Sequence, residues 1–477
     1  MSTTKAPDRV LSTLNADGTR RWLRPKLAEG AFWHKRRVVA YALMVVFFLI
    51  PYLRMNGKPL ILLDLPRREF VLFGTTFLPT DTLLFMLLFV CIGIAIFLLT
   101  ALFGRVWCGW ACPQTVYMEF LYRPIERLIE GGRTGTLALD AQKGFKPRRL
   151  LKYAVFFVLA LFLAHTFLAY FVGIDRLVQW VQLSPLEHPT AFFVMAGTTA
   201  AIMFDFTYFR EQTCLVACPY GRLQSVLLDR QSLIVGYDAR RGEPRMKGTK
   251  DRAEAAGDCI ACDACVLTCP TGIDIRDGLQ MECIHCTQCA DACDDIMDRV
   301  GTPRGLIRYS SRDELEGKPK KVFRPRVILY PAALAVALSL FIYFLGTKED
   351  TDVTILRGIG APYTLEASGR VINQVRVRVT NRADRARQYR IEVGGADGAE
   401  VIAPENPLEV AAGELRTTSL FIVAPPSMFY DGERAVRFTL SDGAGYAATF
   451  DYNLIGPDDD DRERVGRGKG EDTGNDE

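Results

Sequence analysis

Cysteine is absent from the C-terminal part of this 477-residue sequence, since all 13 Cys lie between Cys91 and Cys293. A reducing cytoplasm keeps thiols free to bind metal, whereas an oxidising compartment pairs them in disulfides. We therefore expect the Cys-bearing part to face the cytoplasm, and the Cys-free part to include an exported domain.

The small net charge and the few His residues argue against a nucleic-acid binder and a bis-histidine haem protein. The 58 basic and 55 acidic residues leave a net charge of only +3, whereas a dedicated nucleic-acid binder carries a clear basic excess, so we expect no nucleic-acid partner. There are only four His, and His165 has no apparent His partner within the apolar runs, which argues against a bis-histidine haem. His34 and His285 are isolated, and neither is expected to be a ligand.

Long apolar runs, in contrast, are plentiful. Five of them approach the roughly 20 residues of helix needed to cross a bilayer core. They cover residues 38–55, 82–103, 150–172, 189–206 and 326–346. The first run starts late and lacks a small-residue cleavage site, which excludes a simple secretory signal. The sequence therefore predicts a multidomain membrane protein with an α-helical five-span part.

The distribution of Lys and Arg predicts the orientation, because basic loops are retained on the cytoplasmic side. Basic residues concentrate before the first run, in the connection after the second and before the fifth, whereas the connection at 173–188 holds only Arg176. We expect a multi-pass protein of the bacterial inner membrane, with its N-terminus in the cytoplasm and residues 347–477 in the periplasm.

Eight Cys between residues 259 and 293 carry the most specific signal. Two runs follow the spacing C-x2-C-x2-C-x3-C, which is typical of two-cluster ferredoxins, where the fourth Cys of each run binds the other [4Fe–4S] cluster. One predicted ligand set is Cys259, Cys262, Cys265 and Cys293, and the other is Cys283, Cys286, Cys289 and Cys269. The alternative is zinc, but zinc takes four ligands in two separated pairs. Asp294 stands where a Pro is expected after the last Cys.

A second Cys motif is duplicated next to the apolar runs. Both copies read C-x-x-A-C-P, and the second repeats the first at an offset of 106 residues (108 to 214 and 112 to 218). Since the Pro disfavours helical backbone at the preceding Cys, that Cys should lie at a helix end or turn. Four thiols that converge would form a soft-ligand site for Cu(I), or for zinc or an iron centre. These residues are Cys108, Cys112, Cys214 and Cys218.

Plainer interpretations of these residues remain open. Buried Cys often serve only as small apolar side chains, which is the expected role of Cys91 and an alternative for the duplicated motifs. Asp205 and Arg210 flank the second motif, where they would position it or a quinone headgroup, but a solvated span end is the favoured interpretation.

The exported part has the pattern of an all-β domain. Val375, Val377 and Val379 alternate with Arg, the period of a half-buried strand. Further short segments of this kind, separated by Gly, Pro, Asn and Asp, give about seven strands in about 100 residues, which is typical of an immunoglobulin-like sandwich. An all-β spacer is the alternative.

These features predict six consecutive regions. They are a cytoplasmic N-terminal segment (1–37), a four-span membrane part with the first CxxxCP (38–206), a cytoplasmic region (207–325) with the second CxxxCP and the ferredoxin-like block 255–298, a fifth transmembrane helix (326–346), a periplasmic immunoglobulin-like domain (347–456) and a disordered tail (457–477). Residues 1–30 are also expected to be loosely ordered.

The order of these features resembles the FixG/RdxA/CcoG family of cytochrome c oxidase accessory proteins. The resemblance covers nearly the whole chain and includes the segments FDFTYFREQTCLVACPYGRLQSV and DRQSLIVGYDARRGEPR. It implies a role in assembling the cbb3-type haem–copper oxidase, with reduction of Cu(II) to Cu(I) as the activity. The implied partners are oxidase subunits or copper-delivery proteins.

Two other functions remain open. The paired motifs also resemble those of NapH/NosR-type membrane ferredoxins, which would make the chain a quinol-linked electron conduit to a periplasmic acceptor, and a non-enzymatic assembly scaffold is the third interpretation. No Gly-rich nucleotide-binding fingerprint is evident, so the electron donor must be a separate reductase or the quinone pool.

Overall fold

The computed structural model describes residues 11–15, 17–55, 57–66, 68–79, 81–248, 256–319, 323–348, 350–366, 368–383 and 385–458. The chain forms two compact units, the first ending at Phe344 and the second beginning at Leu345. The predicted disordered tail falls almost entirely outside the described residues.

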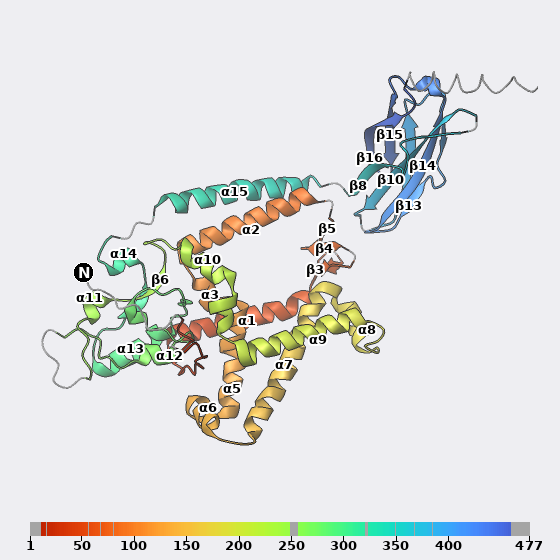
Figure 1. The fold of residues 1–477 in the computed structure, drawn as a ribbon. Coiled ribbons are helices and arrows are strands. Elements are labelled where there is room, and N and C mark those ends of the chain that lie inside the picture. Colours follow the sequence, from red (N-terminus) through yellow and green to blue (C-terminus); the bar gives the residue numbers. More distant parts are fainter. Residues whose placement is uncertain are drawn as a thin grey trace, which may run out of the picture. The chain divides into compact units, whose positions relative to one another are not determined.

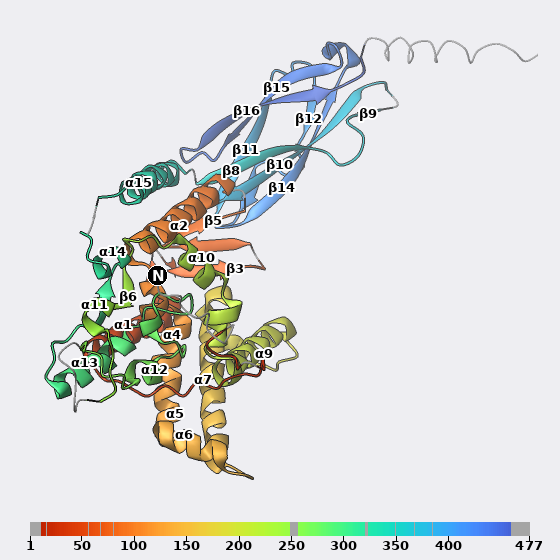
Figure 2. The same cartoon turned by 60° about the vertical axis from the view of Figure 1, so that its left-hand side comes forward.

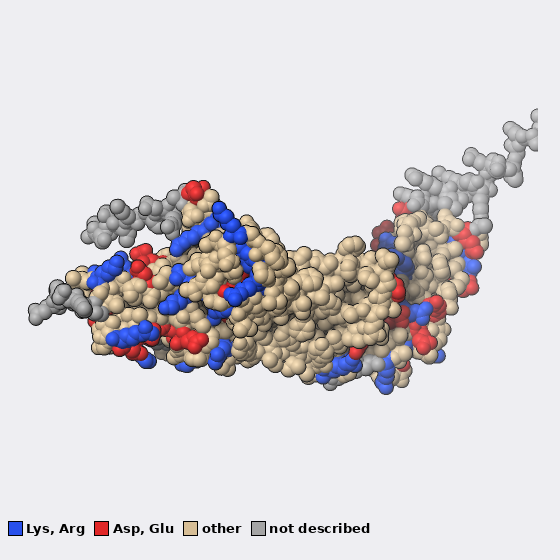
Figure 3. All heavy atoms as spheres, turned by 90° about the horizontal axis from the view of Figure 1, so that it is seen from below, with Lys and Arg blue, Asp and Glu red and all other residues tan. Residues whose placement is uncertain are grey.

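Four helices of the described chain are long and apolar enough to cross a membrane (Figure 1). They are α2 (Thr82–Phe103), α7 (Pro147–Val172), α9 (Pro189–Phe204), which a π-helical turn η3 (Asp205–Phe209) prolongs, and α15 (Pro325–Gly346). Large apolar side chains on them face outward, such as Phe89 and Phe193 at 67% and 72% exposed. Figure 3 shows a wide band almost free of charge over the long helices. Because water would solvate such a surface poorly, these helices indicate membrane insertion.

The first predicted span has a different character. Helix α1 covers Ala31–Leu49, so it starts seven residues before the predicted run, and a short 3₁₀ turn η1 (Ile50–Tyr52) that contains Pro51 follows it. Its first half contains His34, Lys35, Arg36 and Arg37. These charges exclude α1 from the helices with a spanning composition, and the count of five spans remains a prediction.

Short elements connect these helices. A hairpin and a three-stranded sheet follow α1, formed by β1 (Arg54–Met55), β2 (Lys58–Pro59), β3 (Ile61–Asp64), β4 (Glu69–Leu72) and β5 (Thr75–Phe77). After α2 come α3 (Val106–Trp110), α4 (Pro113–Tyr117), the π-helical η2 (Met118–Tyr122), α5 (Arg123–Glu130) and α6 (Gly132–Ala141). Helix α8 (Ile174–Val181) precedes α9, and η4 (Thr213–Ala217) and α10 (Pro219–Leu227) follow it.

The eight-Cys block folds around a small core of its own. It comprises β6 (Ile234–Tyr237), α11 (Ala239–Gly242), α12 (Ala264–Thr268), η5 (Ile275–Asp277), α13 (Gln288–Val300), β7 (Ile307–Ser310) and α14 (Arg312–Leu315). Strands β6 and β7 pair antiparallel, and Met297, Leu306 and Ile307 are buried with several of the Cys. The block packs against the first half of α1 (Figure 2).

The expectation that residues 1–30 are loosely ordered is wrong for the part that the structure describes. Residues 11–15 and 17–30 lie along the eight-Cys block, where the Lys26 amide donates to the Leu267 carbonyl (2.9 Å) and Ser12 Oγ donates to the Thr271 carbonyl (2.6 Å). Leu23 is only 6% exposed. The segment has no periodic apolar pattern, so its order comes from contacts that local sequence does not predict.

The second unit is a sandwich of two antiparallel sheets, as the alternating pattern predicts. One sheet has the order β12 (Glu400–Ile402), β14 (Leu415–Ala424), β10 (Val371–Asn381) and β8 (Thr351–Arg357), with β9 (Thr364–Leu365) also pairing with β10. The other has the order β13 (Leu408–Val410), β11 (Arg387–Gly394), β15 (Glu433–Ser441) and β16 (Ala447–Ile455). Val375, Val377 and Val379 are fully buried between the sheets.

Candidate metal centres

A cavity of about 20 Å³ lies inside the eight-Cys block. Five thiol-bearing residues line it, namely Cys265, Cys269, Cys283, Cys286 and Cys289. Short helices place them, because α12 presents Cys265 and ends before Cys269, while α13 presents Cys289 in its first turn. The remaining walls are mostly apolar, which keeps water from the thiols.

The fourth Cys of each run lies with the other run. Cys269 is close enough to interact electrostatically with Cys283, Cys286 and Cys289, and Cys293 with Cys259, Cys262 and Cys265. This is the grouping expected from two-cluster ferredoxin spacing.

The thiol donors of the block are of the kind that holds four-iron clusters. Among the described residues, no three Cys, His, Asp or Glu side chains are placed to hold one metal ion. Burial raises the pKa of the Cys283 thiol to about 12 and that of Cys286 to about 11. Thiols so buried ionise only beside compensating positive charge, which the iron of a cluster would supply.

Both CxxxCP motifs have the predicted turn at the second Cys. Cys112 and Cys218 adopt extended backbone, with ψ of 127° and 108°, and the next residue is the Pro that begins α4 or α10. Pro suits this first helical position because its missing N–H would have no partner there. Cys108 lies in α3 and Cys214 in the π-helical turn η4.

The four motif thiols lie near one another. Cys214 interacts electrostatically with Cys108, Cys112 and Cys218. Burial raises the pKa of the Cys108 thiol, although the neighbouring Arg105 guanidinium opposes the rise. Burial likewise raises the pKa of Cys112. The arrangement does not amount to a chelate of a single ion, and a bound metal would have to draw the thiols together.

A glycine brings the first motif onto the eight-Cys block. A Cβ at Gly109 would lie 2.6 Å from the Ile284 carbonyl oxygen and 2.8 Å from Cys286 Cα, so only glycine fits without displacing backbone. Cys108, Ile284 and Cys286 share one buried cluster against which Cys214 packs. The motif therefore contacts the backbone that carries a predicted cluster ligand.

Polar side chains that sequence reasoning did not single out fix this contact. The Arg105 amide donates to His285 Nδ1 (3.2 Å), so Nε2 carries the proton, and Tyr309 OH donates to the His285 carbonyl (2.8 Å). Burial and Arg105 lower the pKa of the fully buried His285 to about 3, so it is neutral. The isolated His285 thus joins the block to the first motif through hydrogen bonds.

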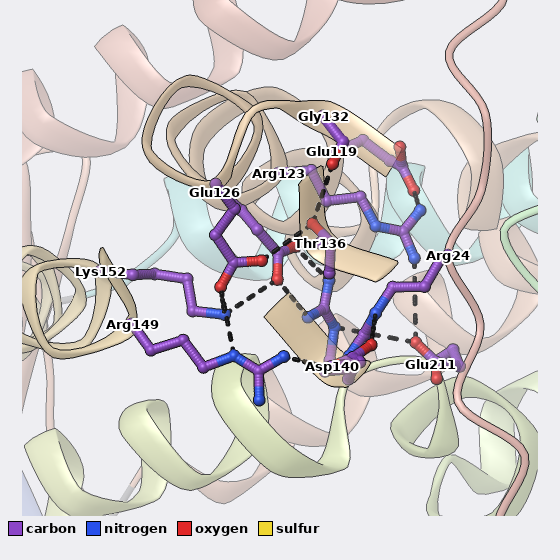
Figure 4. A network of polar contacts seen from close by, with 12 residues as sticks. Arg24, Glu119, Arg123, Glu126, Gly132, Thr136, Asp140, Arg149, Lys152 and Glu211 are labelled. Carbon is purple, nitrogen blue, oxygen red and sulfur yellow. Dashed lines mark hydrogen bonds and ion pairs between the residues drawn. The ribbon is translucent and has the colours of Figure 1, made fainter. Parts of the chain in front are cut away.

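A buried ionic network lies near the second motif, and Figure 4 shows its side chains. Arg210 donates to both carboxylate oxygens of Glu126 (3.0 and 2.8 Å), and Lys152 Nζ lies 3.2 Å from Glu126 and 2.6 Å from Glu130. Burial alone would raise the pKa of Glu126, but Arg210 and Lys152 hold it well below its usual range. Arg210 is only 4% exposed, so the interpretation of this residue as part of a solvated span end is wrong.

This network reaches the motif through a small cavity of about 20 Å³. It is lined by Arg123, Arg210, Glu211 and Cys214 among others, and by Thr271 of the eight-Cys block. Gln114, just after the first motif, donates to the Arg210 carbonyl (3.0 Å). The network thus connects both motifs with the block. The sequence does not predict these ion pairs, because Arg and Glu beside an apolar run usually face solvent.

Comparison with known proteins assigns domain types to three parts of the chain. A family model described as a 4Fe-4S dicluster domain matches residues 209–312, a 4Fe-4S binding domain matches residues 82–130, and the IG-like fold at the C-terminal of FixG matches residues 341–457. The chain is therefore a membrane-inserted iron–sulfur electron-transfer protein with a C-terminal immunoglobulin-like domain.

Individual relatives identify the family. The chain is 34% identical to RdxA and 36% to RdxB of Cereibacter sphaeroides, covering 84% and 88% of this chain and 89% and 92% of theirs. It is 30% identical to the nitrogen fixation protein FixG of Rhizobium meliloti over 90% of this chain and 91% of that protein. The chain belongs to the FixG/RdxA family.

A solved FixG-related protein of Vibrio parahaemolyticus covers 23% of this chain and 98% of its own at 16% identity. Its TM-score of 0.21 does not establish a shared fold.

Proposed function

We propose that this protein is a cupric reductase that supplies Cu(I) for assembly of a cbb3-type cytochrome oxidase. Two [4Fe–4S] clusters, held by Cys259, Cys262, Cys265 and Cys293 and by Cys283, Cys286, Cys289 and Cys269, would supply electrons one at a time. The substrate Cu(II) would bind at Cys108, Cys112, Cys214 and Cys218. The observation that carries the proposal is the contact of Gly109 with the Cys286 backbone.

The residues around the motif suit this reaction. Thiol sulfur prefers Cu(I) to Cu(II), so a four-Cys site favours the reduced ion. Arg105 places a positive charge beside Cys108, which favours the thiolate needed for metal binding. The short path from Cys286 to Cys108 would keep electron transfer within buried protein.

The proposed topology follows from the basic loops. The N-terminus and the eight-Cys block would lie in the cytoplasm of a bacterial inner membrane, and the immunoglobulin-like domain in the periplasm. Oxidase subunits or copper-delivery proteins would then meet the protein at the membrane.

One observation favours a second candidate function. The 4Fe-4S binding domain model matches residues 82–130, which contain the first CxxxCP motif. The four motif Cys would then hold an iron centre, and the chain would conduct electrons from quinol toward a periplasmic acceptor docked on the sandwich.

Cysteine substitutions distinguish these functions. Replacing Cys108 and Cys112 by Ser should lower copper binding and cupric reduction as much as replacing Cys214 and Cys218, and all four changes together should add little, because residues of one site act as a unit. The protein is first reduced chemically under anaerobic conditions, and Cu(I) is measured with a chelator. Cys91→Ser is the matched control, since Cys91 lies within α2 away from the motifs.

The outcomes separate the candidates. Loss of copper reduction with unchanged iron content supports the cupric reductase. Loss of iron with the motif Cys indicates the iron-centre conduit, and copper reduction that survives all four changes contradicts the copper site.

Iron analysis tests the predicted clusters. Anaerobically purified protein should contain about eight irons and eight sulfides per chain, because each of two clusters holds four. Replacing Cys269 or Cys293 by Ser should lower that number. Stoichiometric zinc without iron would contradict the assignment.

A further inference from the structure

An apolar pocket that copper chemistry does not require lies beside the first motif. It has a volume of about 620 Å³, and its walls come from α2, α3 and α10. The residues that matter here are Ile92, Ala95, Leu99, Trp107, Trp110 and Tyr220, with Gln224 at the polar end.

One side of the pocket faces the lipid. Ile92 and Leu99 of the membrane-inserted helix α2 are 46% and 48% exposed, and Trp107 of α3 is 48% exposed. Trp and Tyr prefer the boundary between hydrocarbon and water, because their rings are apolar and carry a polar group. The pocket is thus open to a molecule that diffuses within the membrane.

The inner end of the pocket is polar and touches the motif. Gln224 is only 1% exposed, and its Nε2 donates to Tyr220 OH (2.9 Å) and Thr100 Oγ1 (3.1 Å). Its Oε1 accepts from the Cys108 thiol (3.1 Å). A ligand ring at this end would lie one side chain away from Cys108, which packs against Cys286.

These features define the ligand. It must have an apolar tail for the wall of α2, a flat ring to lie against Trp107 and Trp110, and ring oxygens to bond Tyr220 and Gln224. We propose that this pocket binds an isoprenoid quinol and is the point at which electrons enter the protein. The inference rests on the proposed function, and it names the donor of that reaction.

The reaction balances with the proposed substrate. The two O–H bonds of the quinol break, two protons pass to water, two electrons leave one at a time, and the quinone remains. Each of two Cu(II) ions takes one electron to become Cu(I). The contact of Cys108 with Cys286 places the release of these electrons beside a predicted cluster ligand.

Filling the pocket tests the inference. Ala95→Phe adds a ring to the wall, whereas Val90→Phe adds the same ring on the same helix at a position that is 43% exposed and does not line the pocket. In full-length protein, saturable quenching of Trp emission by decylubiquinone should weaken by about tenfold, or about 1.4 kcal/mol, in Ala95→Phe and not in Val90→Phe. Bleaching of the iron–sulfur absorbance by decylubiquinol should slow by a similar factor in Ala95→Phe only.

The other outcomes are equally informative. Dithionite should bleach all three proteins to the same extent, which shows that the clusters are intact. If decylubiquinone quenches none of them, or all three equally, and mass spectrometry finds only phospholipid bound, the pocket is a lipid groove and the inference is wrong. If dithionite-reduced protein reduces Cu(II) but decylubiquinol does not bleach the clusters, the quinol pocket is wrong and the proposed function stands. Bleaching by quinol without cupric reduction would contradict the proposed function alone.

Discussion

At the scale of single residues, Gly109 decides how closely the first motif approaches the eight-Cys block. Its neighbours are backbone atoms of Ile284 and Cys286, which cannot swing aside as a side chain would. Because Gly109 has no Cβ, the predicted CxxxCP site and the predicted cluster that includes Cys286 lie next to each other here. Electron transfer between them depends on that distance.

We expect Gly109→Ala to destabilise the protein and to slow cupric reduction. Overpacking of this kind costs about 1–3 kcal/mol, because neighbouring backbone must shift. Gly93→Ala is the matched control, since a Cβ at Gly93 meets nothing within 4 Å and should slightly stabilise α2. Thermal unfolding and single-turnover copper reduction measure both effects. Equal behaviour of the two variants would contradict the close contact.

The buried pair of Arg210 and Glu126 gives a second residue-scale prediction. Arg210→Met should lower the free energy of unfolding by about 3–5 kcal/mol, because it removes the guanidinium that binds both oxygens of the buried Glu126 carboxylate and leaves Lys152 as its remaining cationic partner. Adding Glu126→Leu should recover part of the loss. Arg299→Met is the control, since Arg299 pairs with Asp295 at the surface, and it should change the thermal midpoint little. A loss in Arg210→Met no larger than in Arg299→Met would contradict a structural role for the network.

Residue-level prediction succeeded where spacing carries the information. Pro113 and Pro219 predict the extended backbone of Cys112 and Cys218, since that constraint is local. Arg210 was assigned to a solvated span end because its partner, Glu126, is 84 residues away in sequence. Arg105 and Gln224 were missed for the same reason.

At the scale of elements, helix α1 begins against the eight-Cys block. Gly30 is its N-cap and has no side chain to accept from the first amides, and a Cβ there would lie 2.4 Å from Asp291 Cγ. Asp291 of α13 accepts instead from the amides of Phe32 (3.1 Å) and Trp33 (2.7 Å). A residue of the block therefore caps a helix of the membrane part, which a local capping rule does not predict.

We expect Asp291→Ala to loosen this junction. Loss of a cap costs about 1 kcal/mol, so amide hydrogen exchange should rise at the start of α1 and in residues 17–30 that precede it. Asp295→Ala, on the same helix at an exposed ion pair, should leave exchange at α1 unchanged. Unaltered protection in Asp291→Ala would show that other contacts hold the junction.

At the scale of the whole molecule, the sequence patterns predict the iron–sulfur and immunoglobulin-like parts, and the number of spans stays a prediction. The alternation at Val375, Val377 and Val379 predicts the sandwich, because period two is intrinsic to a strand with one buried face. The run at 38–55 coincides with α1 only in part, because the 3₁₀ turn that contains Pro51 follows α1 and the helix itself extends back into charged residues. Whether α1 crosses the membrane therefore needs a measurement of topology.

Reporter fusions supply that measurement. Helix α15 is the one predicted span between the eight-Cys block and the immunoglobulin-like domain. If α15 crosses the membrane, the block and the domain therefore lie on opposite sides. Alkaline phosphatase, which is active only outside, should work when fused after Gly346 and fail when fused at Gly257. The reporter inserted at Asn15 of the full-length chain tests α1 itself: a spanning α1 with four further spans requires an inactive reporter there, on the side of the eight-Cys block. Activity at Asn15 with inactivity at Gly257 would place the start of the chain across the membrane from the block and would contradict the hydrogen bonds between them. Activity at Gly257 would invert the proposed orientation and separate the clusters from a reducing cytoplasm.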